Sequence, residues 1–416
     1  MTVRRALRLA ALAQGRRGLQ RRGKYGNLSP CVAELMKVKL SKGPNMNRRD
    51  FLKTGSAIAA AAISGCKTTA EVKPSAESQK QPLKFPRYRG FNFPVGFGAK
   101  GPQRRKFDEK DFEIIKEWGF DFGRIPMSYW NWADKDDWYN IDENVLKEID
   151  KVVEKGKQYK IHINLNLHRI PGYCINGRKM EPMDLYEDTP ERMQKALDAA
   201  VFHWKMFAKR YKGIPSTQLS FDLINEPPFL KEDTRHVEVV TALVKGIREE
   251  DPNRLIVADG KDIGKLPIMG IADLGVVQST RGYDPKSVSH YTATWVPKNE
   301  FQTFNEPTWP LKGDDGTIWD KAMLRAQCID TWKPLMAKGV PVHVGEWGCF
   351  NKTPHDVAIS WMTDLLSLWR EVGWGYAMWN LRGPFGVLDS AREDVEYEDY
   401  KGHKLDRKML ELIKEY

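Results

Sequence analysis

The chain has 416 residues, enough for a leader and one large domain or for two smaller domains, and its 41% hydrophobic content suffices for a sizeable core. Residues 1–66 carry 14 Lys and Arg against two acids, Glu34 and Asp50, so the formal net charge of +11 belongs to this segment. The other residues hold 52 basic and 53 acidic side chains, which removes the compositional argument for nucleic-acid binding.

The first feature along the chain is a pair of Arg followed by a short apolar run. Residues 47–66 read NRRDFLKTGSAIAAAAISGC, where Arg48 and Arg49 precede an apolar run that is too short to span a membrane as a helix. This order resembles a twin-arginine signal, and its end, Ile63 to Cys66, resembles a lipobox, in which the Cys is acylated and becomes the mature N-terminus. A chance Ala-rich helix is the alternative. We expect residues 46–66 to direct the protein to the periplasm, the outer membrane or the cell surface as a lipoprotein.

The segments around the signal have different expected roles. Met46 directly precedes the signal, so residues 1–45 are expected to be an over-extended start or a disordered basic segment. Residues 67–84 are polar, contain two Pro and show no apolar period, which is typical of a flexible linker. Residues 85–416 are expected to form one catalytic domain.

Within this domain, short apolar runs alternate with long amphipathic segments, which is typical of parallel βα units. The apolar runs predict eight strands, at Tyr88–Phe93, Phe120–Ile125, Ile161–Leu167, Leu219–Ile224, Leu255–Ala258, Gly275–Gln278, Val340–Val344 and Gly375–Trp379. The amphipathic segments predict helices at Asp108–Trp118, Glu143–Lys155, Pro190–Tyr211, His236–Glu249, Ile318–Lys338, His355–Val372 and Leu405–Tyr416. We therefore predict an α/β fold, a single (β/α)8 TIM barrel with loop insertions. A doubly wound open sheet is the alternative, but no GxGxxG follows the first strand.

Polar side chains follow several of these strands, at the end of a barrel where chemistry is expected. The strand-end residues are Arg124, His168, Asn225-Glu226-Pro227, Gly345-Glu346-Trp347 and Trp379-Asn380. A single polar residue at a strand end is explained by a helix cap or a buried ion pair as well as by a function. Five strand ends of this kind converging on one rim favour an active site.

Glu226 and Glu346 are the two carboxyls that glycosidic hydrolysis needs. Strands four and seven lie on opposing sides of the mouth of an eight-stranded ring. A carboxyl separation of roughly 5–5.5 Å would give retention through a covalent intermediate, and the two acids would raise each other's pKa. A second NEP tripeptide contains Glu306, but it lies in a long loop with no apolar strand before it, so Glu226 is preferred.

The motifs NEP, LHRIPG and GEWG, followed by the strand-eight Trp, resemble glycoside hydrolase family 5, the cellulase-like family of clan A, over the whole domain. The resemblance implies that Glu226 is the acid/base and Glu346 the nucleophile. It also implies supporting roles for four further residues: Asn225 contacts the sugar 2-hydroxyl, Arg124 supports the nucleophile, His168 lies on the rim, and Trp379 forms a floor for the sugar at the cleaved bond.

One segment departs from the family pattern. Where the family often has HYYxPxxFTHQxAxW, this sequence has RGYDPKSVSHYTATW, so Tyr283, His290 and Trp295 match and Arg281 replaces a His. An Arg is always charged, so it could lower the pKa of Glu226; alternatively it points away or clamps a substrate group. The substitution affects the expected substrate site and pH optimum more than the reaction class.

The remaining Trp, Cys and His side chains are expected to stack on sugar, pack in the core or form hydrogen bonds. Sugar-stacking candidates are Trp130, Trp132, Trp295, Trp309 and Trp347, with loop packing as the alternative for each; the helical Trp118, Trp204, Trp361 and Trp369 are expected in the core. The five Cys include no CxxC pair, and Cys174 and Cys349 are expected to be inert thiols near the rim. His168, His290 and His343 show no HxxxH or HxH spacing, so we expect neither a metal nor a cofactor.

The expected function is hydrolysis of β-linked glucan or a related polysaccharide or oligosaccharide by an exported monomer. The two alternatives are a non-catalytic glycan-binding lipoprotein, which would usually lack one Glu, and a transglycosylase, which shares all these residues. An esterase is disfavoured because no GxSxG elbow is present.

Overall fold

The computed structural model describes residues 83–96, 98 and 106–416. The expected basic segment, the export signal with Cys66 and nearly all of the expected linker lie outside the described residues. Among the helices of the described part, none combines the length and the apolar character needed to cross a membrane.

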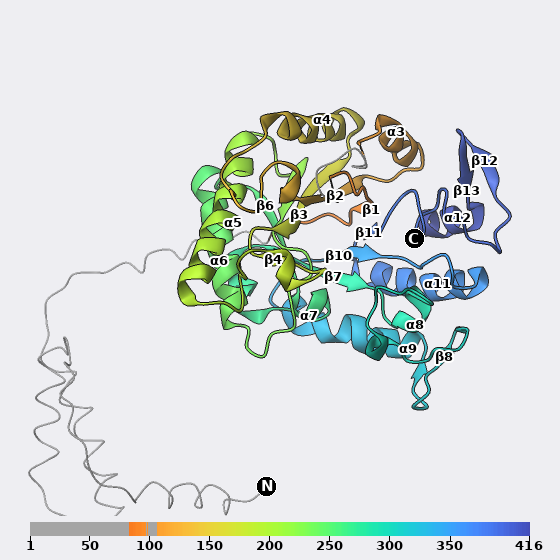
Figure 1. Ribbon diagram of the computed structural model, residues 1–416. Helices are drawn as coiled ribbons and strands as arrows, with labels where there is room; N and C mark the ends of the chain where they lie inside the picture. The colour runs from red at the N-terminus through yellow and green to blue at the C-terminus, as the bar shows by residue number, and fades with distance from the viewer. Residues whose placement is uncertain (1–82, 97, 99–105) are drawn as a thin grey trace, which may run out of the picture. The chain divides into compact units, whose positions relative to one another are not determined.

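Eight parallel strands form a closed barrel (Figure 1). They are β1 (Arg89–Asn92), β2 (Phe122–Ser128), β3 (His162–Ile170), β5 (Leu219–Asp222), β6 (Leu255–Asp259), β7 (Val277–Gly282), β10 (Val342–Trp347) and β11 (Tyr376–Met378). The order β2-β1-β11-β10-β7-β6-β5-β3 is closed by pairing of β2 with β3. The predicted (β/α)8 barrel is confirmed, and the open doubly wound sheet is excluded. A short β4 (Tyr173–Cys174) pairs antiparallel with the end of β3.

Long helices surround the barrel (Figure 1): α3 (Glu109–Glu117), α4 (Glu143–Tyr159), α5 (Pro190–Arg210), α6 (Thr234–Glu250), α11 (His355–Val372) and α12 (Arg407–Glu415). Four of them begin where a capping side chain accepts a hydrogen bond from a backbone N–H of the first turn; the caps are Asp108, Asp142, Thr189 and Asp406. These caps satisfy N–H groups that have no partner within the helix, which fixes where each helix starts.

One predicted helix differs from the structure. The expected helix Ile318–Lys338 is instead a short strand β9 (Ile318–Trp319), α9 (Lys321–Leu324), a π turn and a 3-10 turn, and α10 (Lys333–Met336). Pro334 explains part of the break, because it has no N–H to donate and is tolerated only in the first turn, where α10 begins. No helix is predicted after β6, and the structure has only the short α7 (Lys261–Gly264) and a 3-10 segment, Met269–Leu274, there.

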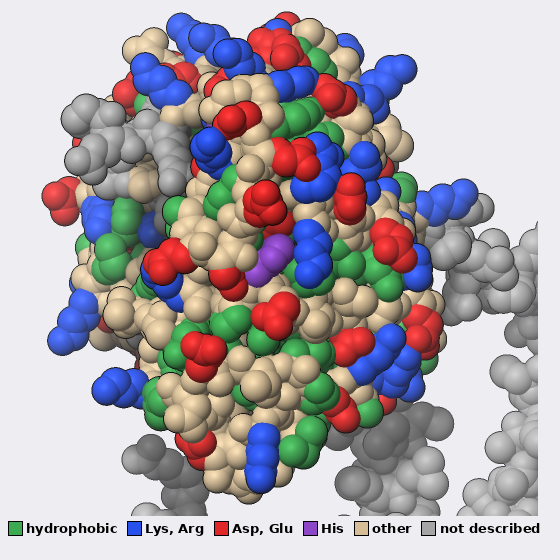
Figure 2. Space-filling model, turned by 90° about the vertical axis from the view of Figure 1, so that its right-hand side faces the viewer, with side chains coloured by type: hydrophobic (Ala, Val, Ile, Leu, Met, Phe, Trp, Pro, Cys, Tyr) green, Lys and Arg blue, Asp and Glu red, His purple; other side chains and the backbone are tan. Residues whose placement is uncertain are grey.

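The remaining elements are short. α8 (Lys286–Ser289) follows β7, β8 (Leu311–Lys312) pairs with β9, and β12 (Glu398–Tyr400) pairs with β13 (His403–Leu405). Short 3-10 turns lie at Tyr129–Asn131, Arg178–Met180 and Lys298–Glu300. Figure 2 shows Lys and Arg interspersed with Asp and Glu over the face that carries β12, β13 and α12, as expected for a near-neutral domain.

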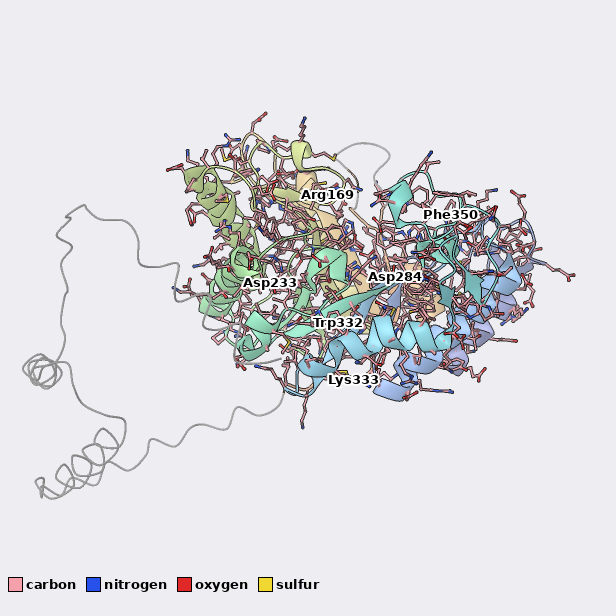
Figure 3. All side chains as sticks on the ribbon, turned by 90° about the horizontal axis from the view of Figure 1, so that it is seen from below. Arg169, Asp233, Asp284, Trp332, Lys333 and Phe350 are labelled. Atoms are coloured by element: carbon pink, nitrogen blue, oxygen red, sulfur yellow. The ribbon has the colours of Figure 1, made fainter. Side chains whose placement is uncertain are left out.

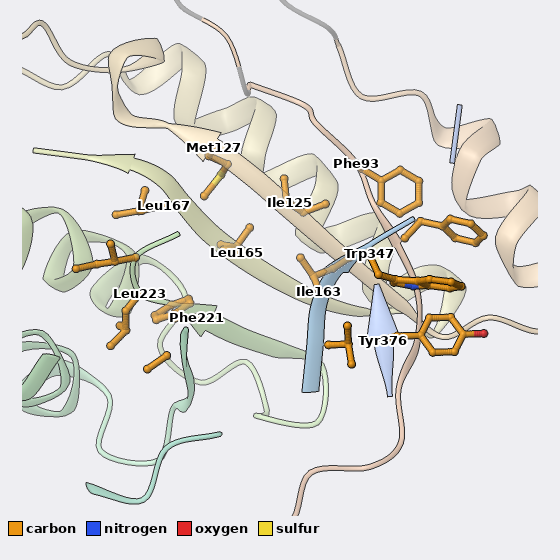
Figure 4. Packing of buried hydrophobic residues seen from close by; sticks show 14 of the residues in the cluster. Phe93, Ile125, Met127, Ile163, Leu165, Leu167, Phe221, Leu223, Trp347 and Tyr376 are labelled. Atoms are coloured by element: carbon orange, nitrogen blue, oxygen red, sulfur yellow. The ribbon is translucent and has the colours of Figure 1, made fainter. Parts of the chain in front are cut away.

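The strands alternate between an apolar layer and a polar interior. On β3, Ile163, Leu165 and Leu167 belong to the main apolar cluster, as Figure 4 shows. Because successive side chains of a strand point to opposite faces, His162 and Asn164 face the other way. Both contact Ser220 Oγ on β5, at 2.7 and 2.9 Å. The barrel therefore offers hydrogen-bonding partners to buried polar side chains.

The two ends of the barrel differ. At the end where β6 and β7 begin, the half-buried Leu83 and Phe85 pack against Leu255, Val257 and Val277. At the other end, loops follow the strands. Arg169, near the end of β3, and Phe350, after β10, lie at this end in Figure 3, and Lys333 lies toward the opposite one. Residues 83–85 thus cover one end of the barrel, and the site lies at the carboxyl end of the strands.

Candidate active site

A cleft of about 930 Å³ lies at the carboxyl ends of the strands. Both proposed catalytic acids, Glu226 and Glu346, line it. Of the other predicted site residues, the cleft is lined by His168, Tyr283, His290, Trp295 and Trp379. The structure thus brings together side chains from β3, β10 and the loops after β5, β7 and β11.

Glu346 lies near the end of β10 and is only 4% exposed. Its Oε1 accepts a hydrogen bond from Arg124 Nη1 at 2.6 Å, and its Oε2 accepts one from the Tyr283 hydroxyl at 3.4 Å. Arg281 Nη2 lies 3.6 Å from the same Oε1. Two buried guanidinium groups at Oε1 and a hydroxyl at Oε2 therefore hold this carboxylate in one orientation.

Arg124 connects three elements of the site. It lies within β2, which extends to Ser128, rather than at the end of the strand as predicted. Its Nε donates to Asp222 at 2.7 Å, and Nη1 and Nη2 donate to the amide oxygens of Asn92 and Asn225, both at 2.9 Å. Burial, opposed by Arg124, raises the pKa of Asp222 to about 7. This network fixes the guanidinium that contacts Glu346.

The backbone of Glu226 is held in an unusual conformation. Its φ of 47° lies in the left-handed region, which non-glycine residues rarely adopt and which costs free energy unless neighbours enforce it. Asp259 Oδ2 accepts its N–H at 2.8 Å, and the Tyr173 hydroxyl donates to its carbonyl at 2.5 Å. Both peptide groups that flank the Glu226 side chain are thus anchored.

The carboxyl group of Glu226 is largely buried, with 16% of the side chain exposed. Its Oε1 accepts a hydrogen bond from Arg281 Nε at 3.0 Å. Burial and the charge of Glu346 raise the pKa of Glu226 to about 7, against the opposing effect of Arg281 and Lys286. Arg281 therefore does lower this pKa, as the sequence suggested, but burial and Glu346 outweigh it.

Arg281 points into the site, so the alternative that it points away is wrong. It lies on β7, which runs four residues beyond the predicted strand end. Its Nη1 donates to Asp259 Oδ1 at 3.0 Å, Nη2 donates to Asp259 Oδ2, and Nη2 also donates to Asn225 at 3.0 Å. Burial lowers the pKa of Arg281, but the surrounding carboxylates raise it by more, to well above its usual value.

The other predicted rim residues form an aromatic wall. The His168 ring lies 5.8 Å from that of Trp379, and its Nε2 lies 3.3 Å from Asn225 Nδ2. His290 contacts Tyr283 edge-to-face at 4.9 Å and Trp295 at 6.2 Å. Burial lowers the pKa of both His168 and His290 well below the usual value, so both rings are neutral at pH 7.

The stacking candidates separate into two groups. Trp295 is 59% exposed and lines the cleft, whereas Trp132 and Trp347 are 1% and 0% exposed and belong to the core. Trp130 and Trp309 are half-buried, and their indole N–H groups donate to carboxylates at 2.7 and 2.8 Å. The helical Trp are buried as predicted: Trp118, Trp204, Trp361 and Trp369.

The second NEP tripeptide lies away from the cleft. Asn305 and Glu306 are exposed on the loop before β8, and neither lines the cleft. Cys174 lines the cleft, Cys349 is fully buried, and both are free thiols, as is Cys328. Within the described part of the chain, no three His, Cys, Asp or Glu side chains are grouped so that they could hold a metal ion. His343 lies inside β10 with its ring 4.7 Å from that of Phe122.

Sequence reasoning missed four residues of the site. Asn92, Asp222, Asp259 and Lys286 were not selected, although the first three lie at the ends of apolar strands. A charged group at the end of an apolar strand needs a partner or a function. This argument selected Glu226 and Glu346, and it applies equally to Asp222 and Asp259. Lys286 comes three residues after Tyr283 and does not follow an apolar strand directly, so nothing in the sequence marked it as a site residue.

Comparisons with known proteins agree with this geometry. The family model described as cellulase (glycosyl hydrolase family 5) matches residues 80–383, and a twin-arginine translocation signal model matches residues 45–65. Endoglucanase C of Acetivibrio thermocellus is 26% identical over 313 residues, which cover 70% of this chain and 88% of that protein.

Two solved structures are similar in fold. One described as a crystal structure of a glycoside hydrolase is 41% identical, with a TM-score of 0.74, and the match covers 79% of this chain and 99% of that one. Cel5A of Thermotoga maritima, solved in complex with cellobiose, is 21% identical with a TM-score of 0.61; the match covers 79% of this chain and 96% of that one.

Proposed function

Because the chain belongs to the cellulase family, glycosyl hydrolase family 5, and is a glycosidase-type hydrolase, we propose that it cleaves β-linked glucan or a related polysaccharide or oligosaccharide with retention of configuration. Glu226 acts as the acid/base and Glu346 as the nucleophile. Arg124, Asn225, Tyr283 and His168 position them.

One observation carries the proposal: a single guanidinium, that of Arg281, contacts both carboxyls. Its Nε lies 3.0 Å from Glu226 Oε1, and its Nη2 lies 3.6 Å from Glu346 Oε1. The two acids therefore lie across one cleft within the span of one planar group. Retaining glycosidases hold their carboxyls about 5–5.5 Å apart, closer than the roughly 6.5–9.5 Å of inverting ones. The shared contact is compatible with the closer arrangement, and the anomer of the product decides between the two.

The two environments suit two different roles. Glu346 contacts two guanidinium groups, which stabilise the anion that a nucleophile requires. Burial and the neighbouring anion raise the pKa of Glu226 to about 7, so a substantial fraction is protonated at neutral pH and can donate to the leaving oxygen. Two carboxyls with different protonation states in one cleft are what a double displacement needs.

The substrate class follows from the lining and the relatives. The cleft combines exposed aromatic rings, Trp295 and Phe229, with the half-exposed Trp379. Flat apolar faces of this kind stack on sugar rings. The relatives matched over most of the domain are named endoglucanases, which favours β-glucan chains over other glycans for this protein.

A substrate panel tests the proposal. The purified chain is incubated with β-glucans, mannan and aryl β-glycosides beside Glu226→Ala, Glu346→Ala and, as a matched control, Glu306→Ala. Activity on β-glucans and mannan should be almost lost in the first two variants and stay at the wild-type level in the third. NMR of the first-formed sugar should show the β anomer. Full activity in either of the first two variants, or a larger loss in Glu306→Ala, would contradict the assignment.

The signal model supports export through the twin-arginine pathway. We further propose that Cys66 carries a lipid anchor, that residues 67–84 tether the domain to it, and that the protein acts as a monomer in the periplasm or at the outer membrane or cell surface. The chain has Ile63-Ser64-Gly65 directly before Cys66, small residues of the kind that precede an acylated Cys.

A further inference from the structure

Arg281 stands where the family pattern has a histidine, and it lies between the two carboxyls of the cleft. On one side it contacts Glu226 and Glu346; on the other, both terminal nitrogens donate to Asp259. Asp222 is the remaining carboxylate that acts on it. Only 3% of its side chain is exposed. A guanidinium does not lose its proton in a protein, so the site contains a permanent positive charge at a fixed place.

The negative charge of this site changes place during a double displacement. In the first step a Glu346 oxygen bonds to the anomeric carbon, the glycosidic C–O bond breaks, and Glu226 gives its proton to the leaving oxygen. Glu346 is then a neutral ester and Glu226 an anion. In the second step Glu226 takes a proton from water, the water oxygen bonds to the anomeric carbon, and the ester bond breaks. The charge returns to Glu346, and the total stays constant.

We propose that Arg281, anchored by Asp259, is a positioning residue that compensates this negative charge at both ends of its path. The inference rests on the roles proposed for Glu226 and Glu346. Its geometry is specific: Nε faces Glu226, and Nη2 faces Glu346, so the guanidinium need not move as the charge moves. A histidine has no such fork of donors.

Asp259 has two functions in this arrangement. Through its two oxygens it fixes the orientation of the guanidinium, and through Oδ2 it also accepts the backbone N–H of Glu226 at 2.8 Å. Arg281 and Glu226 are therefore set relative to each other by one side chain. Its negative charge also reduces the pull of Arg281 on Glu226, which leaves Glu226 able to carry the proton that the first step needs.

Charged groups from four elements face Glu226: Glu346 of β10, Arg281 of β7, Asp259 of β6 and Lys286 of α8. The two carboxylates raise the pKa of Glu226, and the two cations lower it. Removing Arg281 or removing the charge of Asp259 therefore changes the same pKa in opposite directions. If Arg281 and Asp259 served only to hold the loops together, their removal would not shift the pKa of Glu226 in opposite directions.

The first test is the pH profile of kcat/KM for an aryl β-glycoside, measured on the whole protein. Arg281→Met should move the basic limb up by about one pH unit, and Asp259→Asn should move it down by a similar amount. Ser279→Ala is the control, since it removes only a neutral hydrogen bond to Nη1 at 3.2 Å, and should leave the limb in place. Shifts in the same direction, or no shift, would overturn the inference.

A second test separates the two steps. With a dinitrophenyl β-glycoside the leaving group needs no proton, so only the second step depends on Glu226. Arg281→Met should then show a burst of dinitrophenolate and accumulate glycosyl-enzyme at pH 7, and higher pH should abolish the accumulation. Absence of the burst, or a burst that persists at high pH, would contradict a role in keeping Glu226 ionised.

Two controls keep the outcome clear. Arg281→Lys keeps the charge and should retain the position of the basic limb with a lower rate; if Arg281→Met does not fold, this variant and Asp259→Asn carry the test. Glu226→Gln and Glu346→Gln test the proposed function itself. Suppose that both Gln variants are inactive on unactivated substrates, but the basic limbs of Arg281→Met and Asp259→Asn do not move in opposite directions. The inference about Arg281 is then wrong, and the proposed function is still supported.

Discussion

Asp259 Oδ2 accepts the backbone N–H of Glu226 at 2.8 Å, across the gap between the end of β6 and the loop after β5. The contact fixes a residue whose φ of 47° few side chains adopt. The rotation of the Glu226 side chain into the cleft is therefore set by its backbone and not only by its carboxyl contacts. The predictions below start from this fixed position.

The pH dependence follows from the protonation state of Glu226. Its pKa of about 7 means that it is protonated, and able to act as an acid, below that pH and ionised above it. We expect kcat/KM on a glucan oligosaccharide to fall as pH rises through about 7. A pH–rate profile checks this, and the limb should be absent from the residual activity of Glu226→Gln. A basic limb near pH 4.5 would contradict the elevated value.

Glu226→Gln should discriminate between leaving groups. General acid catalysis contributes about 10²–10⁴-fold, and it matters most when the departing oxygen is a poor leaving group. We expect kcat on glucan oligosaccharides to fall within that range, while the first step on a dinitrophenyl β-glycoside stays close to wild type. Equal losses on both substrates would mean that Glu226 is not the acid.

Trp295 and Trp347 are both near the rim but should behave in opposite ways. Trp295 is 59% exposed in the cleft, so Trp295→Ala should raise KM about tenfold, which corresponds to about 1.4 kcal/mol, with little change in Tm. Trp347 is fully buried, so Trp347→Ala should destabilise the fold by about 3–5 kcal/mol. Thermal melts and steady-state kinetics check the pair; a large fall in Tm for Trp295→Ala would contradict the stacking role.

Export and lipid anchoring of the protein can be tested separately by changing residues of the signal segment. Replacing Arg48 and Arg49 with Lys should stop export, because the signal is recognised by its Arg pair. Cys66→Ala should leave export intact but release the protein from the membrane fraction. Fractionation and intact-mass measurement of the mature protein check both. Recovery of unmodified wild-type protein in the soluble fraction would contradict the lipid anchor.

The sequence predicted the barrel well because parallel strands between helices are recognisable as apolar runs of the right length. It did less well where strands are lined with polar groups. β7 reads VQSTRG, so the apolar run ends four residues before the strand does, and Arg281 was placed outside it. β2 likewise runs on through Pro126 to Ser128. Apolar patterning cannot mark a strand end where one face meets a polar interior.

The sequence was enough to predict that Glu226 and Glu346 lie in one cleft, but not to predict the electrostatics around them. Glu226 and Glu346 stand out because each follows an apolar strand within a family motif. The effect of Arg281 depended on contacts between side chains far apart in sequence: Asp259 is 22 residues away and Glu346 is 65 residues away. Whether an Arg lowers a neighbour's pKa decisively depends on burial and on competing charges, and neither is encoded locally.

The central claim is that Glu346 forms a covalent bond to the sugar. The direct measurement is to incubate the protein with a 2-deoxy-2-fluoro β-glycoside bearing a good leaving group, digest it, and locate the added mass by peptide sequencing. We predict one glycosyl adduct, on Glu346, in wild type and a slower one in Arg281→Met. An adduct on another residue, or no adduct together with an inverted product, would contradict the account.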